Sequence, residues 1–150
     1  MEISIRNIDQ QESSQTKSFS RKSMVNSRLV LGIENEKVVY SIAPVEPYER
    51  EVQAEDTDYG FDDAGPAIFF AEVDGKIAGC IKMLKWWNQF GYVEDLVVNP
   101  EYRGLGIGRK LLERGIQWAR ENDLPGVMLE TQDDNVPACR LYQRCGFVLS

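Results

Sequence analysis

A glycine-rich loop followed by two basic residues is the feature of this sequence best suited to binding chemistry. Alternating glycines let the backbone turn its N–H groups toward a ligand, and a following helix adds unpaired N–H donors at its N-terminus. Arg109 and Lys110 fall in the first turn of that helix, where positive charge is normally unfavourable and a bound anion would reverse the penalty. We therefore expect the loop to hold the diphosphate of a bulky nucleotide cofactor. This glycine loop consists of Arg103, Gly104, Leu105, Gly106, Ile107 and Gly108.

Two well-known phosphate-binding loops do not match this spacing. A dinucleotide-binding loop has the pattern GxGxxG directly after a strand, whereas this chain has GxGxG and places residues 99–102 between strand and loop. A P-loop needs Gly-Lys-Ser or Gly-Lys-Thr, and neither tripeptide occurs. The glycine loop is therefore a different class of anion site.

The side chains available for proton transfer are limited, because the chain has no histidine. This excludes Ser-His and Cys-His hydrolases and leaves Glu, Asp, Tyr, Lys or Cys for acid–base chemistry. Cys80, Cys139 and Cys145 form no CxxC pair, so we expect three reduced thiols and no metal site.

The net charge of -7 is unevenly spread along the chain. Residues 46–63 carry eight acids against one base, whereas residues 103–120 carry five bases against one acid. An acidic chain is a poor nucleic-acid binder, and a short basic patch suits a small polyanion. No apolar run approaches the roughly 18 residues of a membrane span, and the N-terminus has no signal-peptide pattern. We expect a cytoplasmic protein without nucleic-acid or membrane partners.

Hydrophobic periodicity predicts one α/β domain with a mixed sheet, in which an antiparallel meander leads into a strand–helix–strand unit. Asp74-Gly75 is a favoured hairpin turn. The acidic segment with Pro44, Pro47 and Gly60 should be an irregular surface excursion. The expected elements are strands at 2–8, 29–33, 38–42, 68–73, 76–86, 92–98 and 127–131, helices at 106–122 and 136–145, and the start of a strand at 147–149.

Three motifs together resemble one known family. The glycine loop fits the pattern R/Q-x-x-G-x-G/A, a strand ending in Asn-Pro-Glu-Tyr-Arg precedes it, and Asn135-x-x-Ala138-x-x-x-Tyr142 is followed by Gly146-Phe147. This combination, over residues 67–149, resembles the GNAT (GCN5-related) N-acetyltransferases, which bind acetyl-CoA. Residues 85–88, 93–96 and 129–133 look most like the streptothricin acetyltransferase branch.

The resemblance implies a GNAT-like acyl-CoA N-acyltransferase fold over residues 1–150. Residues 1–66 would form the acceptor side, and residues 67–150 the acetyl-CoA-binding core. It also implies that strands 92–98 and 127–131 splay apart, so that pantetheine pairs with the backbone there. The implied cofactor-binding residues are Leu96, Val97, Val98, the six residues of the glycine loop, Arg109, Lys110, Asn135 and Ala138.

The family's general acid corresponds to Tyr142, which lies two helical turns beyond Asn135 and on the same face. A phenol with a reference pKa of about 10 is protonated at neutral pH and able to donate, although Tyr142 also fits a plain buried aromatic. Glu94 or Asp95 could deprotonate the amine, and only one should reach it unless the strand bulges. The candidates for attracting a cationic substrate are Trp87, Asp58, Glu130 and Asp133.

GNAT chains usually continue past Gly146-Phe147 through further strands, whereas Ser150 is the last residue here. We therefore expect the C-terminal strands to be truncated, or a partner copy in a homodimer to cover the exposed sheet edge. The leading hypothesis is acetyl transfer to a primary amine of a small cationic acceptor, streptothricin, which inactivates the antibiotic. The alternatives are a GNAT acting on an aminoglycoside, a polyamine or a protein N-terminus, and a non-catalytic acyl-CoA-binding module.

Overall fold

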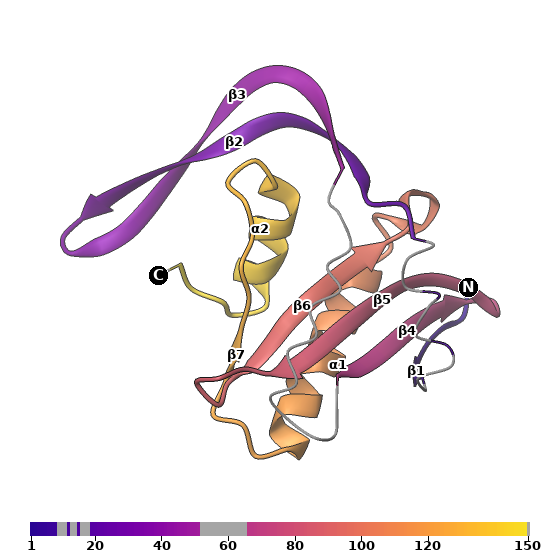
Figure 1. Ribbon diagram of the computed structural model, residues 1–150. Helices are drawn as coiled ribbons and strands as arrows, with labels where there is room; N and C mark the ends of the chain where they lie inside the picture. The colour runs from indigo at the N-terminus through magenta and orange to yellow at the C-terminus, as the bar shows by residue number, and fades with distance from the viewer. Residues whose placement is uncertain (9–11, 13–14, 16–18, 52–65, 150) are drawn as a thin grey trace. The chain divides into compact units, whose positions relative to one another are not determined.

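A computed structural model describes residues 1–8, 12, 15, 19–51 and 66–149 (Figure 1). The chain forms two compact units. Unit 1 comprises Met1–Arg21 and Gln53–Leu129, and unit 2 comprises Lys22–Val52 and Glu130–Ser150. No helix of the described ranges is both long enough and apolar enough to cross a membrane.

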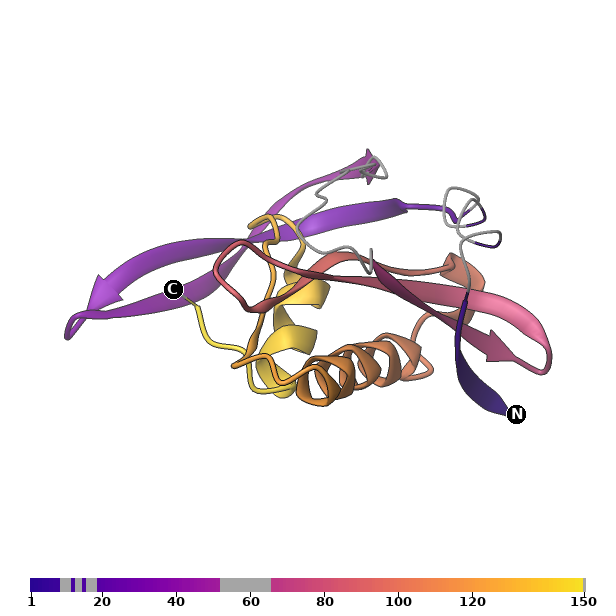
Figure 2. The same cartoon turned by 60° about the horizontal axis from the view of Figure 1, so that its bottom comes forward.

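Unit 1 is a five-stranded sheet with the strand order β1-β4-β5-β6-β7 and one long helix, α1. Neighbouring strands are antiparallel from β1 to β6, and β7 runs parallel to β6. Figure 2 shows α1 lying along one face of this sheet. The predicted mixed sheet, with a meander followed by a strand–helix–strand unit, is confirmed. The bounds are β1 Ile3–Asn7, β4 Ala67–Val73, β5 Lys76–Lys85, β6 Gly91–Val98, the 3-10 helix η2 Pro100–Tyr102, α1 Ile107–Glu121 and β7 Val127–Met128.

The β4–β5 hairpin turns at the predicted dipeptide. Asp74 has φ 50° and Gly75 has φ 82°, the left-handed backbone that a two-residue hairpin turn requires at both positions. Aspartate and glycine adopt this conformation more readily than other residues do. The register Val73↔Lys76 follows directly from this turn, and it shifts between Ala71 and Glu72 farther along the hairpin.

Strand β5 buries side chains on both faces of the sheet. On one face, Ile81 and Met83 approach Gly115 of α1, which has no side chain of its own to occupy that space. On the other face, Cys80 and Phe70 belong to an apolar cluster that also includes Ile8, Phe19, Ile68 and Val97. Burial raises the pKa of the Cys80 thiol, so this cysteine stays protonated and packs as an apolar residue.

Replacing Gly79 with alanine should lower the free energy of unfolding by about 3 kcal/mol. A Cβ at this position would lie 2.6 Å from the backbone oxygen of Val97, and that oxygen cannot retreat without disturbing the β5–β6 pairing. Gly115→Ala is the matched control. Its nearest contacts are the ends of the Met83 and Ile81 side chains, and alanine favours the helix by about 1 kcal/mol. Urea denaturation checks the difference, and equal midpoints for the two variants would contradict it.

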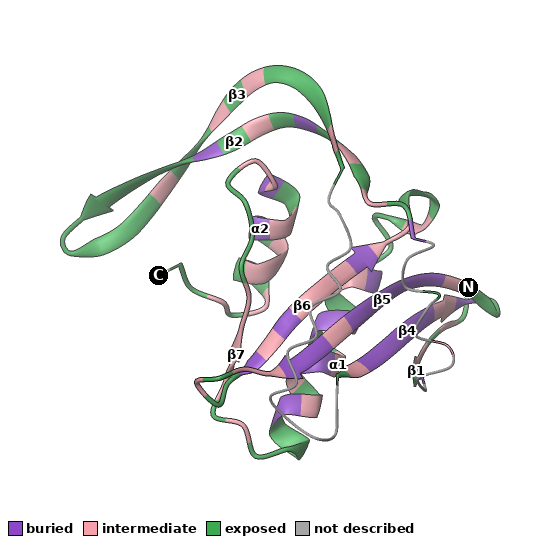
Figure 3. Cartoon of the chain, in the orientation of Figure 1, coloured by how far each residue is buried: buried purple, intermediate pink, exposed green. Residues whose placement is uncertain are grey.

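Unit 2 is a two-stranded antiparallel hairpin, β2 (Lys22–Glu34) and β3 (Lys37–Glu51), with the helix α2 (Val136–Arg144). Leu29 of β2 packs with Val136 and Cys139 of α2, and Tyr40 of β3 packs against this cluster. Most of the hairpin's surface is exposed, as Figure 3 shows.

The predicted short strands 29–33 and 38–42 are wrong in length, and the predicted irregular stretch is wrong from residue 44 to 51. Strand β3 continues through Pro44 and Pro47 to Glu51. Among the described strands β3 pairs only with β2. The edge of β3 that faces away from β2 therefore donates no N–H groups to a neighbouring strand, and proline is tolerated there. The register between β2 and β3 shifts between Val25 and Ser27, so that Pro47 has no pairing partner on β2.

Two other predicted strands also differ from the structure. Strand β7 ends at Met128 rather than at Thr131. From Glu130 onward the chain belongs to unit 2, where the Asp133 carbonyl accepts from the Leu29 N–H at 2.8 Å. Residues 147–149 are not a strand. The Phe147 N–H donates to the Tyr142 carbonyl at the end of α2, which takes the chain out of a strand conformation.

Candidate functional site

The predicted site residues that the structure describes fall into one group in each unit. Asp58 lies outside the described residues. Unit 1 carries Trp87, Glu94, Asp95, Leu96, Val97, Val98, the glycine loop, Arg109 and Lys110. Unit 2 carries Glu130, Asp133, Asn135, Ala138 and Tyr142.

The glycine loop connects η2 to α1 and has the backbone of an anion-binding turn. Gly104 has φ 81° and Gly106 has φ 80°, a left-handed conformation that side chains rarely adopt. Gly106 is the N-cap of α1, and no side chain of the described residues caps this helix end. Ile107 is buried and anchors the helix, whereas residues 103–106 are exposed. The loop therefore presents the N-terminal N–H groups of α1 at an accessible surface.

The basic residues around this loop have different roles. The Arg103 Nε donates to the Val98 carbonyl at 3.1 Å and ties the loop to the end of β6. The Arg109 Nε pairs with the Glu113 carboxylate at 3.0 Å, and both side chains are exposed. Lys110 is exposed beside them. Arg103 thus shapes the loop, and the first turn of α1 contains no acid that would repel an anion.

Replacing Gly106 with alanine should weaken coenzyme A binding about tenfold, which corresponds to about 1.4 kcal/mol. A Cβ at Gly106 meets no atom within 4 Å, so the effect comes from the left-handed backbone, which costs a non-glycine residue roughly 1–2 kcal/mol. Relief of this strain turns the N–H groups away from the ligand. Gly75→Ala is the matched control, because Gly75 has φ +82° and is equally open. Calorimetric titration should show weaker binding for the Gly106 variant alone, and similar losses in both would contradict a role of the loop in binding.

Strand β6 offers an open backbone edge beside the loop. Its pairing with β7 is limited to Gly91↔Val127 and Tyr92↔Met128. From residue 93 to 98, β6 has a strand partner only on the β5 side among the described strands. Val97 is buried in the apolar cluster, and the Val98 carbonyl already accepts from Arg103. An extended ligand could pair with the remaining polar groups of this edge.

Glu94 and Asp95 lie at an irregularity of β6. The register passes from Lys82↔Asp95 to Met83↔Val93, so Glu94 is the extra residue of a β-bulge. Lys82 is the register partner of Asp95, and its Nζ lies 3.4 Å from the Glu94 carboxylate. The bulge therefore brings both carboxylates to one side of the strand, which a regular strand would not do.

Each of these acids has a basic partner that the sequence did not reveal. The Arg21 guanidinium pairs with Asp95 at 2.7 Å, and Lys82 pairs with Glu94. The Glu94 side chain is 1% exposed and the Asp95 side chain 23%. Lys82, a charged residue in the interior of strand β5, was the available signal for such a pair.

The two tryptophans of the β5–β6 turn differ in their contacts and exposure. Trp86 stacks on Tyr92, with 4.3 Å between the ring centroids. Trp87 is 67% exposed and could stack on a ligand. The turn itself is fixed by the Phe90 carbonyl, which accepts from the Trp86 N–H at 2.8 Å.

Helix α2 is capped at both ends by residues of the family motif. The Asn135 side chain accepts from the Ala138 N–H at 3.4 Å, which satisfies one of the free donors of the first turn. At the other end Gly146 has φ 96°, and the Phe147 N–H donates to the Tyr142 carbonyl at 3.0 Å. The rings of Tyr142 and Phe147 lie 6.0 Å apart. These caps define the two ends of α2, and Tyr142 lies in its last turn.

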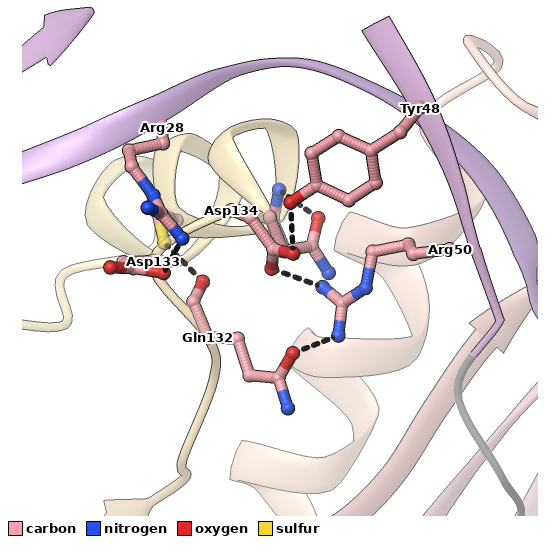
Figure 4. A network of polar contacts seen from close by, with 9 residues as sticks. Arg28, Tyr48, Arg50, Gln132, Asp133 and Asp134 are labelled. Carbon is pink, nitrogen blue, oxygen red and sulfur yellow. Dashed lines mark hydrogen bonds and ion pairs between the residues drawn. The ribbon is translucent and has the colours of Figure 1, made fainter. Parts of the chain in front are cut away.

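A polar network precedes α2, as Figure 4 shows. The Asp134 carboxylate binds the Arg50 guanidinium at 2.8 Å and accepts from the Tyr48 hydroxyl at 2.7 Å. That hydrogen bond raises the pKa of Tyr48 above its ordinary value. Asp133 pairs with Arg28 at 3.5 Å, and Glu130 is exposed. Sequence reasoning missed Arg50 and Asp134, because both looked like ordinary surface charges.

Comparison with known proteins assigns the family. The acetyltransferase (GNAT) family profile matches residues 33–147, more than half of the chain. Streptothricin acetyltransferase A of Bacillus subtilis (strain 168) is 36% identical over 104 residues, and streptothricin acetyltransferase of Escherichia coli is 37% identical over 109 residues. These alignments cover 69% and 73% of this chain. The chain spans 60% of the length of each of these two relatives.

Solved structures share the fold over nearly the whole chain. A protein of Bacillus anthracis str. Ames, described as a candidate streptothricin acetyltransferase and solved in complex with acetyl coenzyme A, matches with a TM-score of 0.88 and 33% identity. Nourseothricin acetyltransferase matches with a TM-score of 0.80 and 26% identity. Both matches cover 99% of this chain, and they cover 86% and 85% of the respective structures. The loop, the mixed sheet, the capped helix and these matches agree: the chain has the GNAT fold and belongs to the GNAT family of acetyltransferases.

Proposed function

We propose that this protein transfers an acetyl group from acetyl-CoA to a primary amine of a small cationic acceptor, and that the acceptor is streptothricin. The observation that carries the proposal is the glycine loop, with its two left-handed glycines before the uncapped N-terminus of α1. Support for the cofactor comes from the related structure solved with acetyl coenzyme A. Support for the acceptor comes from relatives that are themselves streptothricin acetyltransferases. Acetylation of the antibiotic would inactivate it.

In this proposal the cofactor lies along unit 1. The N–H groups of the glycine loop bind its pyrophosphate, and Arg109 and Lys110 add positive charge around it. The pantetheine arm pairs with the open edge of β6 at Leu96–Val98. Asn135 and Ala138 contribute to cofactor binding from the start of α2, as the family motif implies. Each group binds or orients the cofactor, and none of them reacts.

The transfer step needs a base and an acid. The Glu94 carboxylate removes a proton from the substrate ammonium, directly or through a water molecule. The amine nitrogen then bonds to the thioester carbon and loses its second proton to water, while the carbon–sulfur bond breaks. The leaving sulfur receives a proton from the Tyr142 hydroxyl, and the resulting phenolate is reprotonated from water. Asp95 is the alternative base, and its 2.7 Å ion pair with Arg21 is shorter than the 3.4 Å contact between Lys82 and Glu94.

The proposal assigns attraction of the cationic acceptor to an exposed aromatic ring and to exposed acidic side chains. Trp87 offers an accessible aromatic face for a cation. Glu130 is exposed, and Asp133 is half-exposed with a single long contact to Arg28. We also propose that both units belong to one acetyltransferase domain, because the family match from 33 to 147 includes parts of each.

A thiol-release assay tests this proposal. The protein is incubated with acetyl-CoA and a panel of amines that contains streptothricin, an aminoglycoside, a polyamine and an N-terminal peptide. We expect thiol release with streptothricin and little with the others. Preference for another amine would reassign the acceptor and keep the reaction. Coenzyme A binding without release for any amine would instead indicate a non-catalytic acyl-CoA-binding module.

A further inference from the structure

Strand β3 holds both ends of α2 within unit 2. At the start of the helix, Arg50 and Tyr48 of β3 bind Asp134, the residue before the Asn135 cap. Near the end of the helix, the Tyr40 hydroxyl of β3 donates to the Gln143 side chain. The helix that carries Tyr142 therefore contacts one strand near each of its two ends.

The attachment at the start of α2 is the more extensive of the two. Arg50 contacts Asp134 through Nη1 at 2.8 Å and the Gln132 side chain through Nη2. One planar guanidinium thus holds two of the three residues that lead into the helix, as Figure 4 shows. The third residue, Asp133, is fixed through its backbone carbonyl, which accepts from the Leu29 N–H at 2.8 Å.

Burial distinguishes this ion pair from its neighbour. The side chains of Arg50 and Asp134 are 12% and 13% exposed, whereas those of Arg28 and Asp133 are 50% and 51% exposed. Exposed pairs contribute little, because water competes with them and their side chains remain mobile. A pair that is largely shielded from water is different, since loss of one partner leaves the other charge poorly solvated and favours local rearrangement. The segment before α2 therefore depends on Arg50 far more than on Arg28.

We propose that Arg50 is a positioning residue for acetyl transfer: through Asp134 and Gln132 it fixes the start of α2 and thereby the placement of the Tyr142 hydroxyl. This inference rests on the proposed function, in which Tyr142 is the general acid. It gives the β2–β3 hairpin a part in the reaction. A substitution of Arg50 on β3 should impair proton donation by Tyr142, although Arg50 contacts none of the reacting atoms.

The decisive test is whether the effect of an Arg50 substitution on kcat depends on the presence of the Tyr142 hydroxyl. Arg50→Met alone should lower kcat about tenfold or more relative to wild type. Added to Tyr142→Phe, it should lower kcat no further. A residue with only a structural role would lower kcat by the same factor in both backgrounds. Arg50→Lys keeps the charge beside Asp134 but not the planar fork, so it should recover part of the lost kcat. Arg28→Met is the matched control and should stay within twofold of wild type.

The experiment measures kcat and KM for all these variants with acetyl-CoA and the best amine of the panel, below the melting temperature of each. If Arg50→Met does not fold, Arg50→Lys takes its place in the same comparison. Equal effects in the two backgrounds, or an Arg50 variant with unchanged kcat, would overturn the positioning role while the proposed function stands. A wild-type protein without turnover would overturn the proposed function, and this inference with it.

Discussion

Replacing Tyr142 with phenylalanine is expected to lower kcat by a factor of about 10² to 10⁴, the usual contribution of a general acid, while the affinity for coenzyme A stays unchanged. The substitution removes only the hydroxyl. The ring remains available to pack against Phe147, and the cap formed by the Phe147 N–H and the Tyr142 carbonyl is a backbone feature. The helix should therefore keep its structure, and the loss should fall on the chemical step alone.

Tyr40→Phe is the control for this variant. It also removes one hydroxyl, from a tyrosine that contacts the same helix through Gln143 and has no proposed part in the reaction. Steady-state kinetics should give kcat close to wild type for Tyr40→Phe and a large loss for Tyr142→Phe. Unchanged turnover in the Tyr142 variant would remove its role as the acid.

Replacing Glu94 with glutamine is expected to lower kcat about 100-fold at neutral pH, because an amide cannot accept the proton of the substrate ammonium. Glutamine has nearly the same shape as glutamate, so it should fit a side-chain site that is only 1% exposed. Asp95→Asn is the comparison. If Glu94 is the base, the main effect of Asp95→Asn should be lower stability, because Arg21 is 7% exposed and loses its ion-pair partner.

The ion pair with Lys82 requires a further control, because Glu94→Gln also leaves that lysine without its partner carboxylate. Adding Lys82→Met to the Glu94 variant restores the charge balance. If Glu94 is the base, kcat should remain low in the double variant. Recovery to wild-type kcat would show that Glu94 only neutralises Lys82. A 100-fold loss in Asp95→Asn with a mild effect in Glu94→Gln would assign the base to Asp95.

The parts of the fold that could be predicted from the sequence are those set by local residues. The Asp74-Gly75 turn fixes the β4–β5 hairpin, and α1 and α2 lie within one residue of their predicted bounds. The glycine loop could be predicted because each glycine affects the backbone conformation at its own position. The part of strand β3 beyond residue 42 was missed because prolines inside a strand are unfavourable unless one edge is free, which only the sheet arrangement reveals.

The polar partners in the site could not be predicted for a similar reason. Arg21 and Asp95 are 74 residues apart, and Arg50 and Gln132 are 82 residues apart. No periodicity or spacing links such positions, and each residue alone looks like a solvated charge. The β-bulge at Glu94 likewise depends on the register between β5 and β6. Long-range contacts of this kind decide which carboxylates are paired and how α2 is held.

The measurement that tests the central claim most directly is a calorimetric titration with coenzyme A, dephospho-coenzyme A and pantetheine. Dephospho-coenzyme A keeps the diphosphate, and pantetheine has none. If the glycine loop holds the diphosphate, dephospho-coenzyme A should bind within about tenfold of coenzyme A, and pantetheine should bind at least about 100-fold more weakly, a difference of about 2.7 kcal/mol. Equal affinity for pantetheine and coenzyme A, or dephospho-coenzyme A as weak as pantetheine, would contradict the assignment of residues 103–108 as the diphosphate site.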